Sequence, residues 1–108
     1  MVIDTNILIE LHRKEEEVRE NITVISVIEF PPILRYEKFH GEIYTIKPED
    51  QILAIKLQRR LRRLGKPKSV PDLLIAAICI NRNEELLTKD EDFLEISKVS
   101  ELKLKVQK

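Results

Sequence analysis

The chain contains 108 residues, 43% of them hydrophobic and 35% charged, and its formal net charge is zero. This size and balance predict a single folded domain over residues 1–108 and exclude a largely disordered chain. One cysteine excludes a disulfide framework and a cysteine-based zinc site. No apolar run is long enough to span a membrane and we expect no signal peptide, which favours a cytoplasmic location.

Strand and helix patterns alternate along the whole chain. In the first half, we expect a strand over residues 1–3, a helix over 7–11, a strand over 23–27, a helix over 33–39 and a strand over 43–46. The second half continues with helices over 48–64 and 69–80, a strand over 85–88, a helical turn from residue 92 and an edge strand over 102–106. This alternation predicts a parallel sheet with helices on both faces.

Four carboxylates are expected at one edge of this sheet. Asp4 and Asp90 directly follow strands. Glu29 begins the helix after a strand, and Asp72 lies in the first turn of a helix. In a parallel sheet the carboxyl ends of the strands and the amino ends of the following helices share one edge, so the four side chains should converge. Each also has an ordinary alternative role: Asp4 can end a strand or cap a helix, and Glu29 can close a capping box with Ser26.

A cluster of four acids predicts a bound cation, because packed carboxylates repel one another unless a positive charge or a proton neutralises them. Oxygen ligands without histidine or cysteine select Mg²⁺ or Mn²⁺. Such an ion activates a water molecule toward phosphorus and stabilises the leaving oxygen. The pattern is therefore typical of a metal-dependent phosphodiesterase.

Four short motifs occur in order along the chain: Asp4-Thr5-Asn6, Ser26-x-x-Glu29, Asp72-Leu73-x-Ile75-Ala76-Ala77 and Thr88-x-Asp90-x-Asp92-Phe93. Together they resemble the four motifs of PIN domains and, within that family, the short prokaryotic VapC-type toxins of toxin–antitoxin pairs. The resemblance implies an α/β fold of three layers (α/β/α) around a central, mainly parallel sheet of four to five strands. It also implies a Mg²⁺- or Mn²⁺-dependent endoribonuclease, a homodimer, and a small antitoxin whose tail occupies the acidic groove.

The resemblance assigns roles by position. The catalytic, metal-binding quartet would be Asp4, Glu29, Asp72 and Asp90, with Asp92 as a fifth contributor. The residues that brace these carboxylates would be Asn6, Thr88 and Ser26. Two features depart from the family pattern: the interval between Asp4 and Glu29 is short, and Pro31-Pro32 follows Glu29 where the family has continuous helix. Either departure can tilt Glu29 away from a metal.

The segment from residue 56 to residue 68 holds seven basic residues and no acid. Lys56, Arg59 and Arg63 fall on one helical face at spacings of three and four. They are either a solvated face, or a surface that contacts an RNA backbone or the acidic residues of an antitoxin.

Other functions remain open from the residues alone. A PIN-like module that binds a partner without catalysis would keep the fold but lose part of the quartet. A structure-specific DNA nuclease shares the acidic cluster, but 108 residues leave no room for the additional DNA-binding elements of such enzymes. A phosphotransferase with an aspartyl nucleophile would need a second Asp two residues after Asp4, where this chain has Asn6.

Overall fold

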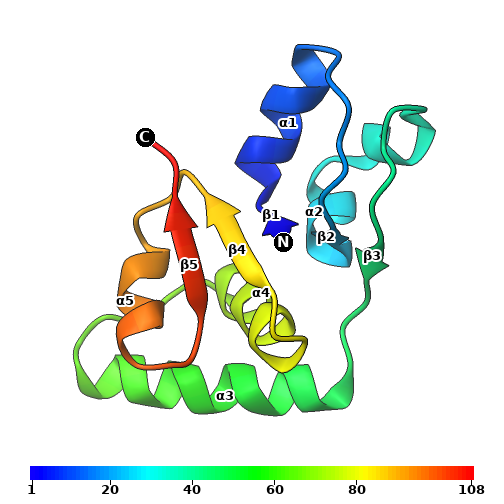
Figure 1. The fold of residues 1–108 in the computed structure, drawn as a ribbon. Coiled ribbons are helices and arrows are strands. Elements are labelled where there is room, and N and C mark those ends of the chain that lie inside the picture. Colours follow the sequence, from blue (N-terminus) through cyan, green and yellow to red (C-terminus); the bar gives the residue numbers. More distant parts are fainter.

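The structure is a computed structural model and describes all residues from 1 to 108. The first half contains β1 (Val2–Ile3), α1 (Thr5–Arg13), β2 (Ile22–Thr23), α2 (Val24–Glu29), the 3₁₀ helix η1 (Pro31–Arg35) and β3 (Ile43–Tyr44). The second half contains α3 (Pro48–Arg63), α4 (Val70–Asn81), β4 (Glu85–Thr88), α5 (Phe93–Lys98) and β5 (Lys103–Val106). Strands and helices thus alternate as the sequence predicts (Figure 1).

The sheet consists of parallel strands in two hydrogen-bonded parts. Strand β4 pairs with β1 on one side and with β5 on the other, and β2 pairs with β3. A parallel bridge between Val2 and Asn21 joins the two parts, and the Ile3 N–H donates to the Asn21 carbonyl at 3.0 Å. The strands therefore follow the order β3–β2–β1–β4–β5, and the expected mainly parallel sheet is confirmed.

Helices cover both faces of this sheet. Val2 and Leu86 pack in a core with residues of α3, α4 and α5. Ile3 belongs to a second core with residues of α1 and η1, and Leu87 packs against that core. Successive strand residues point to opposite faces, so the two cores lie on opposite sides of β1 and β4. The expected three-layer α/β/α arrangement is confirmed.

One predicted strand is wrong. Of the segment 23–27, only Thr23 belongs to a strand, and Val24–Glu29 form helix α2. A short apolar run does not distinguish a buried strand from a buried helix by its periodicity. The capping box expected between Ser26 and Glu29 is also wrong, because the helix begins at Val24 and Glu29 is its last residue.

The helix expected over residues 33–39 is replaced by η1, which ends at Arg35. Pro31 and Pro32 lack the N–H that an α-helical turn requires. The chain instead makes three-residue turns, in which the N–H of Tyr36 donates to the carbonyl of Ile33 at 3.1 Å. The two prolines therefore end the helical stretch soon after Glu29.

The long helix α3 agrees with its prediction in position. Ala54, Leu57 and Leu61 are buried against the core, and α4 is its main neighbour. In Figure 1, α3 runs beneath the ends at which β4 and β5 begin. None of the helices combines the length and the apolar character needed to cross a lipid bilayer.

Candidate metal site

Three carboxylates converge beside the end of β4. Asp72, Asp90 and Asp92 each offer one oxygen, and these atoms lie within 4.8 Å of one another. Asp72 lies in the first turn of α4, where its N–H donates to the Ser69 hydroxyl at 3.4 Å. Asp90 and Asp92 lie on the loop between β4 and α5, and the Asp92 N–H donates to Oδ1 of Asp90 at 2.9 Å. A strand end, a tight loop and a helix start thus bring these acids together.

Asp4 lies at the end of β1 and caps helix α1. Its carboxylate accepts the Thr5 N–H at 2.8 Å and the Thr88 hydroxyl at 2.7 Å, and the residue is 7% exposed. The Thr88 hydroxyl also accepts the Asp90 N–H at 3.0 Å. Asn6 lies between the two loops, with its Nδ2 3.5 Å from Oδ2 of Asp4. Thr88 therefore fixes Asp4 and Asp90 relative to each other across two neighbouring strands.

The protonation of two of these acids is shifted in the direction expected for a cation site. Burial, with smaller contributions from Asp90, Asp4 and Asp92, raises the pKa of Asp72 to about 6. The pKa of Asp4 is also raised, mainly by burial and further by the charges of Glu29 and Asp90, against the hydrogen bonds that lower it. Negative charge at this site is therefore costly without a proton or a cation.

Glu29 is placed differently from the other acids. It is exposed at the end of α2 and lies outside the group of three converging carboxylates. The Thr5 hydroxyl donates to Oε1 of Glu29 at 2.6 Å and lies 2.9 Å from the Ser26 hydroxyl. Thr5, which directly follows Asp4 in the sequence, thus links the side chains of Ser26 and Glu29.

Two further residues beside the acidic site, Thr5 and Lys68, were not predicted as site residues from the sequence. Thr5 links Glu29 to Ser26, and its place inside the Asp4-Thr5-Asn6 motif was an available signal. The Lys68 ammonium lies 3.8 Å from Oδ1 of Asp92. No sequence signal separated Lys68 from the other basic residues near it.

The basic face of α3 does not join the acidic cluster. Lys56, Arg59 and Arg63 are exposed and make no side-chain hydrogen bond or ion pair. Figure 1 shows α3 at the amino ends of β4 and β5, whereas the acids follow the carboxyl end of β4. The cations therefore form a surface separate from the acidic cluster.

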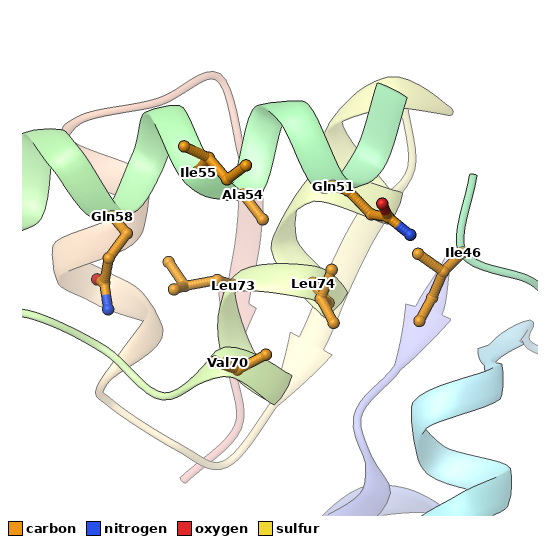
Figure 2. Close-up of a pocket in the computed structure, with 8 residues that line it drawn as sticks. All are labelled: Ile46, Gln51, Ala54, Ile55, Gln58, Val70, Leu73 and Leu74. Carbon is orange, nitrogen blue, oxygen red and sulfur yellow. The ribbon is translucent and has the colours of Figure 1, made fainter. Parts of the chain in front are cut away.

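An apolar hollow of about 410 Å³ opens between α3 and the start of α4. Figure 2 shows Val70, Leu73 and Leu74 of α4 on one side and Ala54 and Ile55 of α3 on the other. The remaining lining residues are Ile46, Gln51 and Gln58. The hollow contains no titratable group, so its chemistry is distinct from that of the acidic cluster.

The chain belongs to the PIN domain family, because the sequence signature of that family matches residues 32–99. The match includes Asp72 and Asp90 but not Asp4 or Glu29. The predicted resemblance is thereby confirmed for the family.

Solved structures show the same fold over nearly the whole chain. VapBC-5 from Mycobacterium tuberculosis superposes with a TM-score of 0.79 at 20% identity, covering 98% of this chain and 97% of that one. DNA-bound VapBC from Salmonella typhimurium gives 0.78 at 16% identity, with 97% and 96% covered. VapBC2 from Rickettsia felis, bound to a promoter fragment, gives 0.72 at 18% identity, with 97% and 96% covered. Among curated proteins, no sequence matches this chain.

The acidic site fits a hard divalent cation. Its converging donors are carboxylate oxygens alone, which is the donor set of Mg²⁺ and Mn²⁺ rather than of zinc or copper. Burial and, to a smaller extent, the neighbouring acids raise the pKa of Asp72, and a divalent ion would offset both effects.

Proposed function

We propose that this protein is a divalent-metal-dependent endoribonuclease and the toxin of a toxin–antitoxin pair. The observation that carries the proposal is the convergence of Asp72, Asp90 and Asp92 within 4.8 Å, beside the buried Asp4. Membership of the PIN domain family and the shared fold of the VapBC structures support the same assignment. The proposal places the protein in the cytoplasm, where cellular RNA is found.

In this proposal the quartet Asp4, Glu29, Asp72 and Asp90 holds Mg²⁺ or Mn²⁺, with Asp92 as a fifth contributor. When bound, the ion supplies a water activated for attack and positive charge at the phosphate oxygens. Thr88 and Asn6 fix the direction of the Asp4 carboxylate, and Ser26 supports Glu29 through Thr5. No side chain forms a covalent intermediate.

The RNA backbone would contact the basic face of α3. Lys56, Arg59 and Arg63 are exposed and free of acidic partners, so binding a phosphate breaks no ion pair. Each contact to a phosphate releases counterions and makes the affinity depend on salt.

The antitoxin assignment rests on the VapBC complexes that share the fold. In the proposal, the antitoxin tail covers the acidic groove and so blocks the metal site from RNA.

We assign the apolar hollow between α3 and α4 to a second copy of this chain. A two-fold interface must be self-complementary, and the hollow lies beside exposed apolar side chains that can fill its counterpart in a partner. Ile52, Ile55 and Val70 are 55%, 61% and 66% exposed. Sedimentation equilibrium should show a dimer that Val70→Asp converts to a monomer. A wild-type monomer would remove this assignment.

The function is tested with purified protein and a pool of single-stranded RNA, in Mg²⁺, in Mn²⁺ and in EDTA. Asp90→Asn should abolish cleavage, while the matched variant Glu91→Gln should retain it, because the exposed Glu91 side chain lies on the same loop but makes no hydrogen bond or ion pair. Equal activity of the two variants would refute the site. A parallel pool of single-stranded DNA tests the DNA-nuclease alternative, and metal uptake without cleavage of either pool would favour a binding module.

A further inference from the structure

Lys68 is a partly buried cation beside the acidic site. It lies in the loop between α3 and α4, four residues before Asp72, and its side chain is 10% exposed. Lysines are seldom buried to this degree unless they are paired. Its ammonium contacts Oε1 of Glu95 at 2.5 Å and lies 3.8 Å from Oδ1 of Asp92. The positive charge is therefore held between a structural acid and a carboxylate of the site.

The main chain of Lys68 is fixed as firmly as its ammonium. Its N–H donates to Oε1 of Gln58 at 3.0 Å, and its carbonyl accepts Nε2 of Gln58 at 2.7 Å. Helix α3 thus holds the backbone of the residue, while Glu95 of α5 holds the end of its side chain. Lys68 is a preorganised charge and not a mobile surface lysine.

Lys66 offers a natural comparison. Its ammonium also pairs with Glu95, at 2.8 Å, but its side chain is 60% exposed and contacts no carboxylate of the site. The two lysines share one acid and one loop. They differ in burial and in their relation to the acidic cluster.

The charge of Lys68 acts on the cluster over a short distance. The ammonium lies between Glu95, at 2.5 Å, and Asp92, at 3.8 Å. A fixed positive charge beside these carboxylates partly neutralises them when no metal is bound. The same charge repels a divalent cation that enters the site.

We infer that the fixed charge of Lys68, which lies beside Asp92, sets the affinity of the metal site for a divalent ion below that of the carboxylates alone. This inference rests on the proposed function. A weakly held ion suits a site in which phosphate oxygens of the substrate complete the coordination of Mg²⁺. Lys68 would thereby link metal occupancy to the presence of RNA.

The test is calorimetric titration of the purified protein with Mn²⁺, without RNA. Lys68→Met should tighten Mn²⁺ binding about tenfold, since a unit charge that repels a dication at short range is removed. Lys66→Met should change the affinity less than about twofold, because an exposed charge is screened by solvent. An affinity in Lys68→Met equal to or weaker than that in Lys66→Met would overturn the inference.

A second pair of variants decides the question if Lys68→Met fails to fold by circular dichroism. Glu95→Gln leaves the Lys68 ammonium with the site carboxylates as its only anions and should weaken Mn²⁺ binding several-fold more than Glu91→Gln does. Equal effects of these two variants would overturn the inference.

Failure of this inference can be told from failure of the proposed function. Metal-dependent RNA cleavage by the wild type, with no difference between the two lysine variants, removes the inference alone. Absence of Mn²⁺ uptake by the wild-type protein removes both.

Discussion

On the β4 side of the acidic site, Asp90 and Asp92 share one tight loop and face Asp72, whereas on the α2 side Glu29 stands exposed at the end of a short helix. The β4 side is held by hydrogen bonds from the N–H groups of Asp90 and Asp92 to side-chain oxygens, and by the first turn of α4. Glu29 is held by one hydroxyl, that of Thr5. The acids at the end of β4 and the start of α4 therefore converge, whereas Glu29, at the end of α2, lies outside that group.

The difference between the two sides also follows from the residues after them. Phe93 continues the β4 side into α5, whose Phe93 and Ile96 are buried in the core. Pro31 and Pro32 follow Glu29 almost directly and replace the expected α-helix with η1. We therefore expect the two sides to differ in what they contribute to metal binding.

The largest expected effect is on cleavage by variants of the two sides. Asp72→Asn should lower the rate of RNA cleavage more than about 100-fold, which exceeds the usual cost of losing a supporting residue. Glu29→Gln should cost about 10-fold, because Glu29 is the exposed member of the quartet and is held by one hydroxyl only. Steady-state cleavage at saturating Mn²⁺ measures both, and equal losses would show that Glu29 contributes as much to holding the ion as Asp72 does.

A second comparison uses pH and the metal-free protein. The pKa of Asp72 is raised to about 6, so the folded state retains a proton that the unfolded state loses near pH 4. The stabilisation from this proton is complete below pH 4 and is lost as the pH rises through 6. We expect a loss of about 1–2 kcal/mol in the free energy of unfolding, after allowance for partial exposure.

Urea unfolding in EDTA at pH 4.5 and pH 7 measures this effect. Other acids also change the free energy of unfolding with pH, in either direction. The useful quantity is therefore the difference in this pH dependence between the wild type and Asp72→Asn. Between pH 4.5 and pH 7 the free energy of unfolding should fall by about 1–2 kcal/mol more in the wild type than in the variant. The same change in the free energy of unfolding between the two pH values in both proteins would contradict the raised pKa of Asp72.

A smaller effect is expected when the link to Glu29 is cut. Thr5→Val removes the hydroxyl that binds Glu29 and Ser26 but keeps the shape of the side chain. Cleavage should fall by about 10-fold or less, and Thr5→Ser should restore most of it. If Thr5→Val had no effect while Glu29→Gln did, Glu29 would act without this support.

The smallest expected effect concerns the basic face of α3. Replacing Arg59 and Arg63 by Ala should reduce the slope of RNA affinity against salt by about two phosphate contacts. Fluorescence anisotropy with a single-stranded RNA, in Ca²⁺ to prevent cleavage, measures this slope. An unchanged slope would mean that this surface, unlike the acidic site, is only a solvated helix face.

Local sequence features were sufficient for much of the fold. The predicted helix over 48–64 corresponds to α3, the predicted strand over 85–88 to β4, and the predicted edge strand over 102–106 to β5. The segment 23–27 was wrong because its β-branched residues suit both a buried strand and a buried helix. Packing in the tertiary structure, and not local preference, settles such a segment.

The sequence by itself determined the order of most strands and helices and the family, because periodicity and motif spacing are local properties of the chain. Only the tertiary structure decided which acids converge, that Thr88 joins Asp4 to Asp90, and that Lys68 rather than its neighbour Lys66 lies against Asp92. These relations depend on distances between residues far apart in the chain. Such distances are set by how β1, β4, α4 and α5 pack, which no single stretch of sequence encodes.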